Sequence, residues 1–339
     1  MTTYDGLLMR DNLADNGVVP SPGYPYHSPD IISHSQVEKP DTFFKANYDS
    51  NPNEAIELES RTNRIYVRTK NLSTAAKTRW YISVYRSTAS LFTNTNLWKT
   101  SPLKTAAGHE HISLANLQPN DIGVGGEAFL LSGVDSEYFC LIGIASSTQV
   151  PTIPDPFATF NDYVVWVRAN QDVCGNNLTT VRNYPDRTLS RLDEYSNPED
   201  EDVITAFKLT AVRLPVGTTF GVECPPLNDK KQRTITSNSK SRILGAGGIS
   251  PAKFTGNVTT WVTLPSGTTT WPAGGNVSTD LYVGMDLRHA SIVYAENLRS
   301  IGVDRSEVTA MGRRGRLVRV GSIGSFRYLI GRSASSNRL

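Results

Sequence analysis

The residues best suited to chemistry are two histidines, His109 and His111, which flank Glu110. On a strand, a His-x-His spacing places both rings on one face, where they could bind a metal ion. The sequence offers no third ligand nearby and no HExxH motif. We therefore interpret this pair as a surface turn that enters a strand, and we predict no metal and no cofactor.

The other catalytic and ligand-binding motifs are incomplete. The acidic run from Glu199 to Asp202 lacks the Asp-x-Asp-x-Asn-Gly pattern of a calcium loop, so we interpret it as solvated linker. Phosphate-binding glycine motifs and the G-x-S-x-G nucleophile turn are absent. The Gly-rich stretch 245–248 follows no convincing strand and is predicted to be flexible loop. We predict no catalytic residues and a protein that is not an enzyme.

Three cysteines, Cys140, Cys174 and Cys224, form an odd set without a CxxC spacing. Such a set predicts neither a disulfide framework nor a zinc site. Cys140 lies within an apolar run and is expected to behave as a small core residue. A bridge between two of the three stays open at this point.

Partner recognition is better represented than catalysis. Trp98 and Trp271 lie in predicted loops, where exposed aromatic side chains often mark recognition surfaces. Trp80 and Trp166 lie in predicted strands and are expected in the core. A basic tail near the C-terminus adds five candidate docking residues: Arg313, Arg314, Arg316, Arg319 and Arg327.

The basic tail admits three interpretations. It could bind nucleic acid or anionic lipid, form a docking strand, or be only a basic surface. We favour the docking strand, because residues 317–320 and 326–330 are rich in β-forming side chains. The strand could pair with another subunit or with the second sandwich of the same chain. A net charge of only +2 gives no support for a nucleic-acid partner.

The composition favours short strands joined by many turns. The chain has 339 residues, which suggests two domains, and 26 Gly with 19 Pro supply the turns. No apolar run is long enough to span a membrane, and no targeting segment begins the sequence. We expect a chain made as a soluble cytoplasmic protein that acts outside the cell or in a particle.

Alternating strands define the first domain, predicted over residues 28–185. In the stretch 63–71, Ile65 and Val67 point to one side, whereas Tyr66, Arg68 and Lys70 point to the other. Together with its neighbours this pattern predicts an antiparallel, immunoglobulin-like β-sandwich. The predicted strands cover residues 30–32, 65–70, 80–85, 111–114, 138–145, 163–167 and 178–181.

The remaining segments complete the predicted organisation. Residues 1–27 are expected to form an extended arm, and the polar stretch 186–202 a linker. Residues 203–285 predict a second β-sandwich, with strands at 203–209, 220–224, 258–264 and 280–283 and a mobile loop at 228–250. Residues 286–339 are expected to hold a short helix, over 286–302, and the basic tail. The predicted fold class is all-β, with two antiparallel sandwiches.

A set of motifs in the first domain resembles a known family. The motifs are SPDI at 28–31, NRIYVRTKN at 63–71, VYRS at 84–87 and FCLI at 139–142. Their order resembles the bacterial CARDB-type (cell-adhesion-related) immunoglobulin-like domains over about residues 28–183. The resemblance implies a sandwich scaffold and carries over no catalytic residue.

These observations favour a non-enzymatic protein that works as a structural or binding component of an assembly. The expected partner is a second copy of the chain or a larger protein assembly, and a cell-surface ligand is an additional expectation. The alternative is a toxin or effector exported without a signal peptide. That alternative requires a hairpin able to enter a membrane, and residues 255–270 are the only candidate segment.

Overall fold

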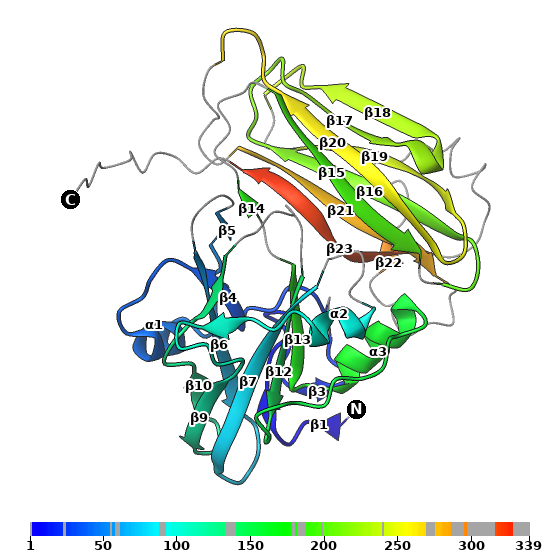
Figure 1. Ribbon diagram of the computed structural model, residues 1–339. Helices are drawn as coiled ribbons and strands as arrows, with labels where there is room; N and C mark the ends of the chain where they lie inside the picture. Colours follow the sequence, from blue (N-terminus) through cyan, green and yellow to red (C-terminus); the bar gives the residue numbers. More distant parts are fainter. Residues whose placement is uncertain are drawn as a thin grey trace.

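Two antiparallel β-sandwiches form the two lobes of the computed structural model (Figure 1). The all-β fold class predicted from the sequence is therefore confirmed. The structure describes residues 2–22, 25–54, 56–57, 62–87, 93–132, 140–177, 180–181, 188–197, 199–238, 241–268, 275–285, 295–296 and 316–327.

The first sandwich packs a six-stranded sheet against a four-stranded sheet. The six strands are β2 (Leu7–Leu8), β4 (Ile31–His34), β6 (Asn63–Asn71), β8 (Lys104–Thr105), β10 (Ile122–Val124) and β11 (Phe129–Leu131). The four strands are β7 (Lys77–Ser87), β9 (Ile112–Leu117), β12 (Cys140–Ser146) and β13 (Val173–Asn177). Two short pairs accompany them: β1 (Thr2–Thr3) with β3 (Val18–Val19), and β5 (Ile56–Glu57) with β14 (Thr180–Val181).

The core of this sandwich follows the alternation of its strands. Ile65 and Val67 of β6 are fully buried in the core, as the sequence predicted. Tyr66, on the opposite face of β6, packs with Phe44 in a smaller cluster. The predicted strands at 30–32, 65–70, 80–85 and 111–114 are confirmed. The strands predicted at 138–145 and 178–181 are confirmed over their described parts, 140–145 and 180–181. Leu141 in β12 is fully buried, as expected for a central strand.

The expectation of an extended arm over residues 1–27 is wrong. Strand β2 pairs with β6, and the side chains of Leu7 and Met9 are fully buried. The apolar run that contains these residues supplies core surface, and burying it holds this segment against the sheet. The N-terminal residues are therefore part of the first sandwich.

A buried group of charges holds this segment in place. The Asp30 carboxylate accepts hydrogen bonds from the guanidinium groups of Arg10, at 2.6 Å, and Arg68, at 2.8 Å. Arg10 is 4% exposed, and Asp30 and Arg68 are fully buried. The two guanidinium groups also donate to backbone carbonyls of Phe44, Asn47, Tyr48 and Ser50. One carboxylate thus joins the N-terminal segment, β4, β6 and the chain after the first helix.

The second sandwich has sheets of four and five strands. The four are β15 (Thr188–Asn197), β17 (Thr219–Cys224), β18 (Asp229–Thr234) and β20 (Phe254–Thr263). The five are β16 (Val203–Val212), β19 (Ser241–Ser250), β21 (Asn276–Met285), β22 (Ala295–Glu296) and β23 (Arg316–Arg327). All four strands predicted for this domain are confirmed.

Two segments predicted to be irregular are strands. The linker expected over 186–202 contains β15, which pairs with β20 along ten residues. The mobile loop expected over 228–250 contains β18 and β19, with the Gly-rich stretch 245–248 inside β19. Ala246 is fully buried there, so this glycine-rich strand packs closely against the core.

Three short α-helices and a 3₁₀ turn complete the described chain. They are α1 (Pro40–Ala46), α2 (Thr95–Lys99), α3 (Phe160–Ala169) and η1 (Pro225–Leu227). The strand predicted at 163–167 is wrong, because these residues lie in α3. Thr159 caps this helix by accepting a hydrogen bond from the Asp162 N–H. Tyr163 and Val167 lie on one helical face and are buried together.

The C-terminal part departs from the expected helix and free tail. Ala295–Glu296, inside the helix expected over 286–302, form β22, and the rest of that range lies outside the described residues. β23 lies between β21 and β22 in the five-stranded sheet. This is the pairing within the same chain that the sequence left open.

One apolar cluster runs from the first sandwich into the second. It includes Tyr26 and Cys140 of the first lobe, Tyr163 of α3, and Phe207 and Phe220 of the second lobe. Lys253 adds a polar link, since its ammonium group donates to the Ala158 carbonyl at 3.1 Å. The two sandwiches therefore share buried apolar surface.

Truncating Leu141 to Ala tests the central position of β12. We expect the variant to lose about 2–5 kcal/mol of unfolding free energy, because the lost methyl groups leave a cavity. Urea titration followed by circular dichroism measures this loss. A change below about 0.5 kcal/mol, the usual size of a surface substitution, would contradict a central position for β12.

Replacing Asp30 with Asn tests the buried charge group. The variant keeps the side-chain shape but leaves two buried guanidinium groups without their counter-ion, which costs about 3–5 kcal/mol of unfolding free energy. The matched control is Asp41→Asn, which removes an exposed carboxylate 2.9 Å from Lys45 and should change stability by at most about 0.5 kcal/mol. Equal effects of the two substitutions in urea titration would contradict this structural role for Asp30.

Candidate functional site: a hollow on the first sandwich and a sheet edge on the second

The predicted docking residues do not gather into one surface. Trp98 is fully buried in α2, with its ring centroid 6.3 Å from that of Tyr163, so its prediction as an exposed recognition residue is wrong. Arg316, Arg319 and Arg327 lie on β23. Trp271, Arg313 and Arg314 lie outside the described residues. A docking role for these arginines and for Trp271 stays a prediction.

The two histidines form the surface turn that the sequence predicted. They precede β9, and their rings stack with centroids 6.2 Å apart and an interplanar angle of 15°. The hollow beside them is also lined by Glu127 and Gln149. In the described part of the chain, no group of three or more His, Cys, Asp or Glu side chains is placed to hold a metal ion.

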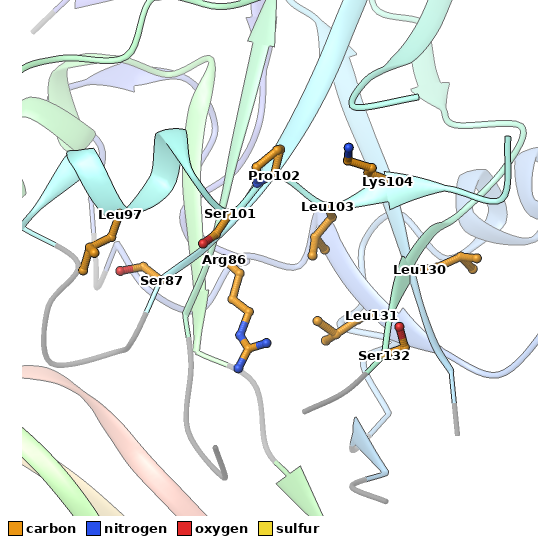
Figure 2. A pocket seen from close by; sticks show the side chains of 10 residues that line it. All are labelled: Arg86, Ser87, Leu97, Ser101, Pro102, Leu103, Lys104, Leu130, Leu131 and Ser132. Carbon is orange, nitrogen blue, oxygen red and sulfur yellow. The ribbon is translucent and has the colours of Figure 1, made fainter. Parts of the chain in front are cut away.

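A second hollow, of about 500 Å³, lies at the end of β7 (Figure 2). Its floor and walls come from β7, α2, β8 and β11. Arg86 extends into it from β7, and Leu103 and Leu131 lie on the far side (Figure 2). The lining residues are Arg86, Ser87, Leu97, Ser101, Pro102, Leu103, Lys104, Leu130, Leu131 and Ser132.

Backbone pairing creates this hollow. The Arg86 N–H donates to the Ser101 carbonyl at 2.9 Å, and the Leu103 N–H donates to the Val84 carbonyl at 2.8 Å. The chain after α2 is thereby held along the end of β7. This pairing brings residues that are far apart in the sequence around one opening.

The hollow combines apolar, hydroxyl and positively charged groups. Four leucines supply apolar surface, three serines supply hydroxyl groups, and Arg86 and Lys104 supply positive charge. The Lys104 ammonium lies 3.0 Å from the Glu110 carboxylate, and this ion pair weakens the positive potential that Lys104 adds to the hollow. The ten lining residues include no His, Cys, Asp or Glu that could act as a general acid, base or nucleophile. Such a lining could hold a ligand that has apolar parts and an acidic group.

The three thiols are core groups. Cys140, Cys174 and Cys224 are all free and buried, so the bridge that the sequence left open does not form. Burial raises the pKa of Cys140 to about 12 and also raises the pKa of the other two thiols. The Cys224 thiol donates a hydrogen bond to the Tyr195 hydroxyl at 3.5 Å. None of the three is a thiolate near neutral pH, which is the reactive form of cysteine.

A second candidate surface is the outer edge of β15. Among the strands that the structure describes, this ten-residue strand ends the order β15-β20-β17-β18. Its Leu189 and Tyr195 face the core, whereas Leu192 is 67% exposed. A long edge strand presents backbone N–H and C=O groups to a further strand.

The sequence did not predict either surface. The hollow combines Arg86 with a segment about fifteen residues later, and no motif links the two. The sequence signal for β15 was weak, because Leu189 and Tyr195 share one face of the strand but the odd positions between them hold Arg191 and Asp193.

Comparisons with known proteins identify no family. No family model matches the chain, and no curated protein does. No helix within the described ranges is long and apolar enough to cross a lipid bilayer.

Three solved structures are weakly similar to the chain. Red sea bream transglutaminase is 10% identical, with a TM-score of 0.20, 67% of this chain covered and only 28% of the transglutaminase spanned. CBD12 from CALX1.2 is 5% identical, with a TM-score of 0.18 and coverages of 70% and 79%. The collagen-binding domain of the Erysipelothrix rhusiopathiae surface protein RspB is 9% identical, with a TM-score of 0.16 and coverages of 81% and 94%. TM-scores this low carry no argument about the function of this chain.

Replacing both His109 and His111 with Ala tests the absence of a metal role. We expect the thermal unfolding midpoint of the double variant to match that of the unaltered protein, because the rings lie in a surface turn. Elemental analysis of both proteins is the second measurement. A stoichiometric metal that is present in the unaltered protein and lost from the double variant would contradict the prediction.

Proposed function

We propose that this chain is a non-enzymatic structural or binding component of an extracellular or particle assembly. Its β-sandwiches would recognise other subunits or a surface. The observation that carries the proposal is the outer edge of β15, with Leu192 exposed beside it. The proposal has two further parts. Residues 28–183 resemble the CARDB-type domains, and the protein acts outside the cell that makes it.

Strand addition is the physical basis of the proposal. Backbone groups along ten residues of β15 can pair with a strand of a second copy, and such hydrogen bonds need no particular side chains. Leu192 would then lose its solvent exposure in the contact. Burial of one leucine side chain contributes about 1.5–3 kcal/mol, a useful share of a subunit contact.

The hollow beside Arg86 offers a second point of attachment. An acidic side chain or chain terminus of a partner would meet the guanidinium group there, while its apolar atoms would contact the leucine side chains. This lining favours recognition of a protein segment over binding of a nucleic acid, because only two of its ten residues are cationic.

The toxin or effector alternative receives less support. Its candidate membrane hairpin, residues 255–270, contains most of β20, which lies between β15 and β17. Val258 and Val262 are fully buried in the core of the second sandwich. Inserting this segment into a membrane would require the sandwich to come apart, which makes the assembly role the better proposal.

Light scattering after size-exclusion chromatography tests the assembly role. We expect the unaltered chain to elute as an oligomer and the Leu192→Lys variant to shift towards the monomer mass, since a lysine disfavours edge pairing. Negative-stain images of the unaltered protein should show particles larger than one chain.

The matched control is Val150→Lys, which places the same charge at an 81% exposed position in the first sandwich. We expect this variant to keep the oligomeric state. A monomer at every concentration of the unaltered protein would overturn the assembly proposal. Equal shifts in the two variants would show that β15 is not the contact.

A further inference from the structure

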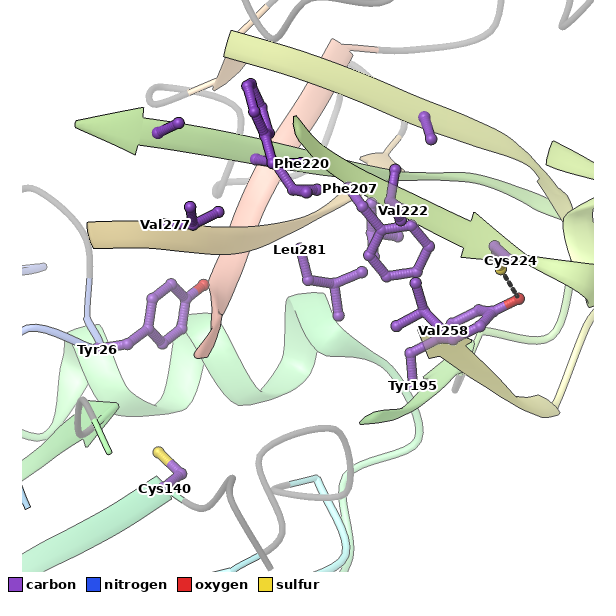
Figure 3. Close-up of a cluster of buried hydrophobic side chains, with 14 of the residues drawn as sticks. Tyr26, Cys140, Tyr195, Phe207, Phe220, Val222, Cys224, Val258, Val277 and Leu281 are labelled. Atoms are coloured by element: carbon purple, nitrogen blue, oxygen red, sulfur yellow. Dashed lines mark hydrogen bonds between the residues drawn. The ribbon is translucent and has the colours of Figure 1, made fainter. Parts of the chain in front are cut away.

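The outer face of the sheet β15-β20-β17-β18 carries an organised set of side chains. Phe220, Val222 and Val258 point into the core (Figure 3), so the residues that alternate with them face outward. Strand register places the outward residues in rows across the sheet. The rows are Thr188-Thr263-Thr219-Thr234, Ser190-Trp261-Gly221-Gln232 and Leu192-Thr259-Glu223-Lys230.

Trp261 lies across the neighbouring strand at Gly221. A Cβ atom added to Gly221 would lie 2.2 Å from Cζ2 and 2.5 Å from Cε2 of the indole. Only a glycine leaves room for the ring in this position. The side chain of Trp261 is partly exposed, so the indole forms a platform on the sheet surface.

Polar groups surround this platform. The Lys230 ammonium lies over the indole ring, 5.7 Å from its centroid, so it already makes a cation–π contact there, and it lies 2.8 Å from the Glu223 carboxylate. Gln232, in the same row as Trp261, is exposed. The hydroxyl groups of the threonine row lie about one hydrogen bond apart, at 3.1 Å for Thr188 and Thr263 and 3.0 Å for Thr219 and Thr234.

We propose that this face binds a neutral carbohydrate, with a sugar ring stacked on Trp261. The C–H groups of a pyranose are weakly positive and suit the negative face of an indole. Its hydroxyl groups would donate to Glu223 and accept from Lys230 and Gln232, and hydrogen bonds to charged groups are the stronger kind. The alternative is that Trp261 serves only to cover Gly221. Any aromatic ring could do that, and this role would not explain the polar side chains around the indole.

The charge of the face selects the class of ligand. Glu223 and Lys230 neutralise each other, and the other described side chains of the three rows are uncharged. An anionic polymer or a lipid headgroup would find no net positive charge there. A protein partner that covers the sheet face, as distinct from a strand added at the β15 edge, would need more apolar area than Trp261 and Leu192 provide. The inference goes beyond the assembly role and holds for a monomer as well.

Native affinity electrophoresis tests the inference. The protein is run in gels that contain a β-glucan, a xylan, a galactomannan or dextran, each compared with a gel without polysaccharide. We expect at least one of these neutral polysaccharides to retard the unaltered protein and not to retard Trp261→Ala. The control Phe43→Ala removes a 38% exposed aromatic ring from the first sandwich and should leave the retardation unchanged.

Two further variants keep the test decisive if Trp261→Ala does not fold. Trp261→Tyr keeps an aromatic ring over Gly221 and should retain weaker retardation. Gln232→Ala changes an exposed residue and should raise the apparent dissociation constant about fivefold through the loss of one hydrogen bond. Thermal unfolding of each variant shows whether it folds.

Three outcomes would overturn the inference. The first is that none of the four polysaccharides retards the unaltered protein. The second is that folded Trp261 and Gln232 variants are retarded as strongly as the unaltered protein. The third is retardation by heparin alone that disappears at high salt, because that behaviour would indicate binding through charge.

Discussion

The first sandwich depends on the burial of the Asp30 carboxylate between two arginines. Arg10 comes from the N-terminal segment and Arg68 from β6, and both are almost fully buried. Ions are costly to remove from water, so this group is stable only while every donor finds its acceptor. The carbonyls of Asn47 and Ser50 supply acceptors for Arg68. Misfolding of α1, β4 or the N-terminal segment would leave a buried charge unpaired. The free-energy cost of that charge disfavours alternative folds of this sandwich.

The second lobe depends on apolar packing in which α3 takes part. Tyr163 and Val167 of α3 belong to the same cluster as Phe207 and Phe220. Shared burial of this kind limits relative motion of the lobes, since separating them would expose apolar surface to water. A rigid pair of sandwiches can present a sheet edge and an outer sheet face in fixed positions. Both features suit a protein whose task is recognition, because less conformational entropy is lost on binding.

The sequence alone determined the strands whose two faces differ clearly. Ile65 and Val67 alternate with Tyr66 and Arg68, and the structure buries the two sets in different environments. The apolar run around Leu141 likewise predicted a central strand. Such patterns are reliable because side chains on a strand alternate between faces whatever the rest of the fold does. They sufficed for the fold class and for the long strands β6, β7 and β12 of the first sandwich and β16, β17, β20 and β21 of the second.

Only the tertiary structure decided the elements whose local pattern is ambiguous. Residues 163–167 are mostly β-branched or aromatic and read as a strand, but capping by Thr159 and burial of one helical face make them α3. Polar β15 and glycine-rich β19 became strands because neighbouring strands supply their hydrogen bonds. Cross-strand register brought Trp261 beside Gly221 and Glu223 beside Lys230. Register is a property of strand pairs, so no stretch of the sequence encodes these neighbours on its own.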